Sequence, residues 1–179
     1  MSTFRRRLAR EKALQVLFSY EVSKEPLRFI EDQQLTQLQE KPAEFIFAIE
    51  LIRLTTENAE ELDTWIKTKI QHWEFQRLAM VDKIALRIAI CELLYFPEIP
   101  AKVTLNEAIE IVKLFSTDKS GQFVNGVLDS ILQDMKTKKL LKKTGRGVLE
   151  NGVSPQEMPT PSPHREKAKS RRSARSKRA

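Results

Sequence analysis

The sequence has few of the residues that form tight turns or covalent cross-links. It contains five glycines in 179 residues, and none of them precedes Gly121. Because glycine supplies many of the turns between short strands, this scarcity favours long helices over a sheet with many hairpins. The single cysteine, Cys91, excludes an internal disulfide and is typical of a reducing compartment. We therefore expect a cytoplasmic, all-α protein.

The usual catalytic and cofactor motifs are also missing. The two histidines, His72 and His164, lie far apart, and no Cys/His spacing suits a metal ion. No glycine-rich loop of the kind that binds phosphates or dinucleotides occurs. Cys91 lies in an apolar stretch, where a packed thiol is more common than a nucleophile. We predict no catalytic residues, no metal site and no cofactor, hence a protein that is not an enzyme.

Long uninterrupted apolar runs are absent as well. The most apolar region, residues 78–96, is interrupted by four charged residues: Asp82, Lys83, Arg87 and Glu92. This pattern excludes a simple membrane span and is typical of a buried helix with polar positions.

The positive charge is concentrated at one end of the sequence. Residues 141–179 contain eleven basic and three acidic residues, a net charge of +8, so residues 1–140 carry about −1 of the total +7. The same segment contains four of the eight prolines and cannot build a core. We predict a helical domain over residues 1–140 and a disordered basic tail over residues 141–179.

Apolar residues recur at helical spacing through most of residues 1–140. The expected helices cover residues 3–22, a segment beginning at Pro26, a segment beginning at Pro42 with a break near 55–58, and residues 79–95, 104–115 and 123–135. Residues 72–75 and 116–121 are expected to be loops. Thr104 is a candidate N-cap with Glu107 as its capping-box partner. Gly126, inside a helix, suggests close approach of a second helix.

The first helix begins with an unusual cluster of arginines: Arg5, Arg6, Arg7 and Arg10. Cations are disfavoured at a helix N-terminus, where the macrodipole is positive. A bound polyanion would relieve this conflict, since phosphates accept paired guanidinium hydrogen bonds. Phe123, near the start of the last expected helix, could stack on a base or pack in the core. The pattern favours an RNA-binding surface.

A helical projection divides this cluster. At 100° per residue, Arg6 and Arg10 continue the stripe of Ala13 and Leu17, which faces the core. Either the first turns extend beyond the core, or Arg10 is partly buried and paired with an acid. The alternative for Arg7 is an ordinary surface pair with Glu11.

Several blocks of the sequence, in this order, resemble the NusB family of transcription antitermination factors. The blocks are Arg6-Arg7-Leu8-Ala9-Arg10-Glu11 with Ala13 to Phe18, Val81-Asp82-Lys83 with Leu86 to Ala89, Asn106-Glu107-Ala108-Ile109-Glu110, and Phe123-Val124-Asn125-Gly126-Val127-Leu128-Asp129. The resemblance extends from about residue 4 to residue 132. Residues 19–75 match as a helical pattern alone, and the basic tail is not part of it.

The resemblance implies two three-helix subdomains that bind boxA RNA of ribosomal RNA operons. It further implies a partner, the small-subunit ribosomal protein NusE, and entry into the RNA polymerase antitermination complex. The candidate RNA-binding residues are Arg5, Arg6, Arg7, Arg10, Lys119, Gln122 and Phe123. The candidate NusE-binding residues are Phe18 and Asp82; a tyrosine is common in the family at the position of Phe18.

Three alternatives remain open at this stage. The chain could be a non-catalytic interaction scaffold or a homodimer in ribosome biogenesis, with the arginines paired to acids. It could be a catalytic subunit, since NusB-like domains also precede RNA cytosine methyltransferase domains, although residues 141–179 leave no room for one. The tail could add sequence-independent RNA affinity or be a solubilising extension.

Overall fold

A computed structural model describes residues 3–70 and 74–145, with side chains described from Arg6 onward. The predicted loop residue His72 and most of the predicted tail, residues 146–179, lie outside the described residues. Within the described part the chain forms seven α-helices and two short 3-10 helices, with no strand. The expectation of an all-α fold is confirmed.

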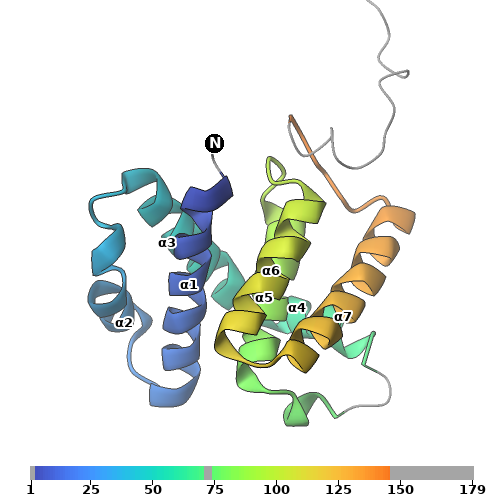
Figure 1. Ribbon diagram of the computed structural model, residues 1–179, viewed down its shortest axis with the longest axis horizontal. Coiled ribbons are helices and arrows are strands. Elements are labelled where there is room, and N and C mark those ends of the chain that lie inside the picture. The colour runs from blue at the N-terminus through green and yellow to red at the C-terminus, as the bar shows by residue number, and fades with distance from the viewer. Residues whose placement is uncertain (1–2, 71–73, 146–179) are drawn as a thin grey trace, which may run out of the picture.

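The helices follow one another with short connections (Figure 1). Their bounds are α1 Thr3–Ser23, α2 Leu27–Gln34, α3 Pro42–Glu57, α4 Ala59–Lys67, α5 Met80–Tyr95, α6 Ala101–Phe115 and α7 Asp118–Thr137, with 3-10 turns at Thr36–Leu38 and Phe75–Arg77. Pro42 occupies the first turn of α3, where proline is tolerated because that N–H has no partner in a helix.

The helices form two packed groups. Helix α1 contacts both α2 and α3 to form the first group, and α5, α6 and α7 form the second group. Figure 1 shows the first group beside the second, with α1 running alongside α5 and α6. Helix α4 packs on α5 and α7. The expected pair of three-helix subdomains is therefore confirmed. Helix α4 follows α3 in the sequence and connects the first group to the second.

Helix α5 is the central helix of the core. Ile84, Leu86 and Ile90 are almost completely buried, as are residues on its other faces. It contacts α1 and α3 of the first group as well as α4, α6 and α7. This explains an apolar pattern that covers most of the helix rather than one stripe. None of the described helices is both long enough and apolar enough to cross a membrane.

The predicted start of α6 was wrong by three residues. The helix begins at Ala101, and the carbonyl of Pro100 accepts the amides of Val103 and Thr104. Thr104 is therefore inside the helix, buried, and its hydroxyl donates to Glu92 rather than capping. Pro100, directly before the helix, has a φ of −60°, which is compatible with a helix start. The capping-box pattern at Thr104 and Glu107 therefore did not mark the start of this helix.

The start of α7 also differs from expectation. The last helix begins at Asp118 because the side chain of Thr117 accepts the amide of Ser120 and caps it. The predicted loop is thus reduced to residues 116–117. Helix α2 ends at Gln34. No described atom lies within 4 Å of a Cβ built on Gly126, so the predicted close helix approach there was wrong.

Candidate nucleic-acid interface

The arginines of α1 lie at the junction of the two helix groups, and their exposure decreases along the helix. The side chains of Arg6 and Arg7 are each 34% exposed, whereas that of Arg10 is 2% exposed. Each pairs with a glutamate of the second group. Arg5 lies in α1, but its side chain is outside the described part of the chain. The cluster thus ranges from a surface pair to a buried one.

Arg10 forms a buried, two-pronged ion pair with Glu92 of α5. Its Nε and Nη2 donate to the two carboxylate oxygens at 2.5 and 2.9 Å. Thr104 of α6 donates to the same carboxylate at 3.2 Å. Burial lowers the pKa of Arg10, but the charge and hydrogen bonds of Glu92 outweigh it and raise the pKa overall. The sequence-based alternative in which Arg10 is buried and paired with an acid is confirmed.

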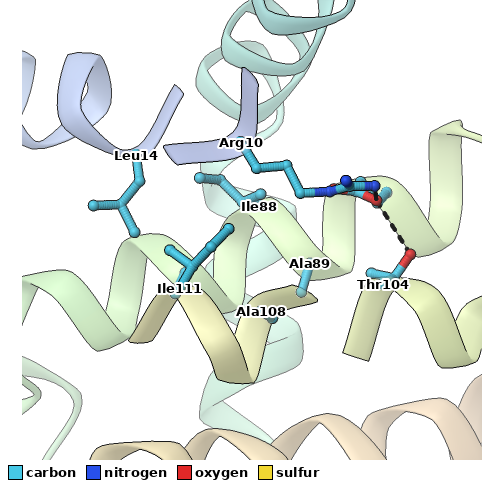
Figure 2. A pocket seen from close by; sticks show the side chains of 9 residues that line it. Arg10, Leu14, Ile88, Ala89, Thr104, Ala108 and Ile111 are labelled. Carbon is cyan, nitrogen blue, oxygen red and sulfur yellow. Dashed lines mark hydrogen bonds and ion pairs between the residues drawn. The ribbon is translucent and has the colours of Figure 1, made fainter. Parts of the chain in front are cut away.

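Figure 2 shows Arg10 reaching from α1 toward Thr104 on α6, beside a small cavity. The cavity is lined mainly by apolar side chains, including Leu14, Ile88 and Ile111. Nη1 of Arg10 makes no hydrogen bond within the described part and lies 4.0 Å from a carboxylate oxygen of Glu107. This guanidinium is therefore held inside the interface between the helix groups.

Arg7 and Glu107 form the second pair, between α1 and α6. Nε and Nη2 of Arg7 donate to the two carboxylate oxygens at 3.0 and 2.8 Å. The hydrogen bond to Glu107 is the main reason that the pKa of Arg7 is raised. Arg7 thus bonds to Glu107, 100 positions along the chain, rather than forming the alternative surface pair with Glu11. The contact aligns the first turns of α1 with the first half of α6.

Of Arg6, Arg7 and Arg10, Arg6 pairs with the most exposed glutamate. Its Nη1 donates to Glu98, in the loop between α5 and α6, at 3.2 Å, and the Glu98 side chain is 51% exposed. The guanidinium also lies 4.8 Å from the ring centre of Phe47 on α3. Phe47 packs edge-to-face on Phe96 at 5.4 Å. A rigid aromatic pair thus supports an otherwise exposed cation.

A second basic residue contacts the same loop from the other end of the described chain. Nζ of Lys143 donates to the carbonyls of Glu92 and Phe96, at 3.2 and 3.0 Å. The amide of Thr144 donates to the carbonyl of Pro97 at 3.0 Å. Burial lowers the pKa of Lys143 to about 8 despite nearby Glu92 and Glu98. Residues 143–144 are thereby fixed to the end of α5.

The remaining candidate RNA-binding residues lie on α7. Lys119 and Gln122 are exposed, whereas Phe123 is half-buried and packs against the core. The first turns of α7 lie against the second half of α6, since a Cβ on Gly121 would meet Lys113. Figure 1 shows α7 starting at the lower end of α6, whereas α1 starts at the upper end. The predicted set is therefore divided between two helices.

The two candidate partner-binding residues lie near the opposite end of α1. Phe18 is 37% exposed, and exposed Val22 on α1 and Phe29 on α2 are further apolar residues of this region. Asp82, in the first turn of α5, is 6% exposed, and its Oδ1 has no hydrogen-bond partner in the described part. Phe18 therefore offers a contact surface directly, whereas Asp82 is covered by its neighbours.

Sequence reasoning identified the arginines but missed most of their partners. Phe47, Glu98 and Lys143 carry no local motif, and each reaches α1 or the α5–α6 loop from far along the sequence. Glu92 and Glu107 could have been recognised as partners of the arginines from the sequence, because acids at inward-facing helix positions need a cationic partner. No three His, Cys, Asp or Glu side chains within the described residues are arranged to hold a metal ion.

Comparison with known proteins places this geometry in a family. The sequence profile of the NusB family matches residues 7–133. The transcription antitermination protein NusB of Chloroherpeton thalassium is 41% identical over 163 residues, covering 88% of this chain and 75% of the relative.

Solved structures agree with this match. NusB of T. maritima has a TM-score of 0.67 and 38% identity, with 72% of this chain and 91% of that chain covered. A structure of the antitermination factors NusB and NusE in complex with dsRNA has a TM-score of 0.64 and 26% identity, with 75% and 99% covered.

Proposed function

Because the chain belongs to the NusB family, we propose that it is an RNA-binding transcription antitermination factor that binds boxA RNA together with NusE. The observation that carries the RNA-binding part is the pair Arg6 and Arg7, partly exposed at the start of α1 and supported by Phe47 and Glu107. The similar NusB–NusE complex contains RNA, which favours RNA as the polyanion.

Arg6 is the principal phosphate ligand in this proposal. Its pair with Glu98 is exposed to water, and such pairs contribute about 0–1 kcal/mol. A phosphate, which accepts two guanidinium hydrogen bonds, can therefore displace Glu98. Arg7 would bind phosphate beside Glu107, with its orientation fixed by two hydrogen bonds.

Arg10 is a candidate RNA ligand by the family resemblance, but its buried ion pair favours a structural role instead. With 2% of its side chain exposed, it cannot reach an RNA phosphate without breaking the pair with Glu92. Such a pair is costly to break because the remaining charge would be buried alone. We assign Arg10 as a positioning residue that holds the first turns of α1 against α5 and α6.

NusE is proposed to bind at the other end of α1, around Phe18. Eleven residues separate Arg7 from Phe18, a helical rise of about 16 Å. Exposed Phe18, Val22 and Phe29 offer apolar area for a partner. The two macromolecules can then bind together, and the pair would join the RNA polymerase antitermination complex. Lys119 and Gln122, exposed on α7, are proposed to extend the RNA surface.

The test measures binding of a boxA-type RNA and of a shuffled RNA, with and without NusE. We expect the double variant Arg6→Ala/Arg7→Ala to weaken boxA binding at least tenfold and to lower the salt slope by roughly one unit per lost phosphate contact. Phe18→Ala should weaken NusE binding while leaving the salt slope for RNA unchanged.

The matched control is Arg53→Ala, which removes one exposed arginine from α3 that pairs with Glu57. It should bind boxA RNA like the wild type. If the Arg6/Arg7 variant stays folded by circular dichroism and binds boxA RNA like this control, the proposed RNA surface is wrong.

A further inference from the structure

One aromatic ring on α3 contacts two arginines of α1. Cζ of Arg6 lies 4.8 Å from the ring centre of Phe47, and Cζ of Arg10 lies 5.2 Å from the same centre. Both distances are within the roughly 6 Å at which a guanidinium is attracted to the face of an aromatic ring. Phe47 is therefore shared between one arginine that is partly exposed and one that is buried.

The position of this ring is fixed by its surroundings. Phe47 is 5% exposed and packs edge-to-face on Phe96, the residue that follows α5, with ring centres 5.4 Å apart. Arg10, which is held in its buried ion pair, is a second fixed neighbour of the ring. The ring thus gives Arg6 a rigid contact from inside the fold.

The two contacts of Arg6 respond differently to a bound phosphate. Glu98 accepts a hydrogen bond from Nη1 of Arg6, so it occupies a donor that a phosphate also needs. A cation–π contact requires no hydrogen bond and leaves the N–H donors of the guanidinium available. A phosphate can therefore replace Glu98 while the contact with Phe47 is retained.

We propose that Phe47 is a positioning residue for RNA binding, which holds the Arg6 guanidinium at the surface where a phosphate binds. The inference rests on the proposed function, since it needs Arg6 to be a phosphate ligand. It extends that function to a buried residue that acts on RNA through Arg6 rather than by contact.

Two physical effects make this contact important for affinity. An arginine side chain has many rotamers, and a ligand that binds the guanidinium has to restrict them. Contact with a rigid ring restricts them before the ligand arrives. In addition, RNA that covers Arg6 removes water from the 34% of its side chain that is exposed. Because a cation–π contact is stronger when it is desolvated, the contact with Phe47 stabilises the complex more than the free protein.

The experiment replaces Phe47 with mono-, di- and trifluorinated phenylalanine in the full-length chain. Successive fluorines withdraw electron density from the ring face with little change of shape, so they weaken its attraction to a cation and largely preserve its packing. We expect the affinity for a boxA-type RNA, measured without NusE, to fall stepwise by about two- to fivefold in total. Affinity that stays constant through the series would overturn the inference.

Phe75, in the 3-10 turn before α5, provides the matched control. Its ring is also contacted by two cations, since Nζ of Lys67 and Nζ of Lys83 lie 4.8 and 5.4 Å from the ring centre. The same fluorinated residues at Phe75 should leave RNA affinity within experimental error of the wild type. A stepwise fall of equal size at Phe75 and Phe47 would indicate a general effect of fluorination and would contradict the proposal.

The Arg6→Ala background tests whether Phe47 acts through Arg6. In that background the fluorinated residues at Phe47 should leave RNA affinity unchanged, because the contact that they weaken is absent. Fluorination also weakens the contacts of Phe47 with Arg10 and Phe96, and this effect is the same in both backgrounds. An equal fall in affinity with and without Arg6 would therefore mean that Phe47 acts through the fold, and the inference would be wrong.

The salt dependence distinguishes positioning from direct contact. Arg6→Ala should lower the slope of log affinity against log salt by roughly one unit, because a phosphate contact is lost. Trifluorinated phenylalanine at Phe47 should leave this slope unchanged while the affinity falls, since Arg6 still contacts the phosphate once RNA is bound. A slope that falls as far as in Arg6→Ala would contradict the positioning role.

Arg6→Ala also separates the two proposals. If Arg6→Ala and Arg6→Ala/Arg7→Ala bind RNA like the wild type, the proposed function fails. If Arg6→Ala weakens RNA binding but the fluorinated residues at Phe47 do not, the positioning role of Phe47 alone fails.

Discussion

Arg10 and Glu92 join the two helix groups through two hydrogen bonds between α1 and α5, with both side chains almost fully buried. Thr104 donates to the same carboxylate from α6. Three helices from both groups thus meet on one ion pair. The arginines at the surface of α1 owe their position to this buried one.

Replacing Arg10 with methionine should destabilise the fold strongly. Removal of one partner leaves the Glu92 carboxylate buried without its counter-ion, which costs about 3–5 kcal/mol. The free energy of unfolding, measured by urea titration at neutral pH, should fall by that amount. Met fills most of the volume of the arginine stem, so loss of packing is a smaller contribution.

The double variant Arg10→Met/Glu92→Met separates charge from packing. With both charges removed, the interface becomes apolar, and exchanges of this kind are often neutral or stabilising. We expect the double variant to be more stable than Arg10→Met alone. A double variant that is destabilised by the sum of the two single effects would show that the ion pair is not the source of the cost.

How far the sequence predicts this site depends on the range of the contacts. The positions of most helices and the burial of α5 follow from the local periodicity of apolar residues. The helical projection of the first helix indicates that Arg10 faces the core. The pairing of Arg7 with Glu107 does not follow from either pattern, because it joins positions 100 residues apart. Glu107 was interpreted as a capping residue since Thr104 precedes it by three positions. The start of α6 at Ala101 instead turns both side chains inward.

Glu98→Gln should strengthen RNA binding. The substitution removes the carboxylate that competes with phosphate for Arg6 and also removes a negative charge from the surface. For an exposed pair worth about 0.2–1 kcal/mol, the expected gain in affinity is roughly 1.4- to fivefold. Fluorescence anisotropy with a boxA-type RNA at low salt measures it.

The control for that prediction is Glu57→Gln on α3. It removes one charge from a similarly exposed pair with Arg53. Its affinity for RNA should remain within experimental error of the wild type. Equal gains from both variants would indicate a general charge effect rather than release of Arg6.

Gly126→Ala should stabilise the protein. Gly126 is exposed within α7, and nothing described lies within 4 Å of an added Cβ. Alanine is favoured over glycine inside a helix by about 0.8–1.0 kcal/mol, so the melting temperature should rise. At Gly121 the added Cβ would lie 3.2 Å from Cγ of Lys113. Gly121→Ala should therefore gain less, and a larger gain there would contradict this reasoning.

Lys143 should make stability depend on pH above neutrality. Its pKa is lowered from 10.5 to about 8, mainly by burial, so between these values the unfolded chain binds more protons than the folded one. The free energy of unfolding of the wild type, relative to Lys143→Met, should therefore rise from pH 8 to pH 10 and be lowest below pH 8. Urea titrations at four pH values measure this difference, with Lys142→Met as the exposed control. A difference that is flat or falls with pH would mean that the amine is better hydrated than its contacts with α5 imply.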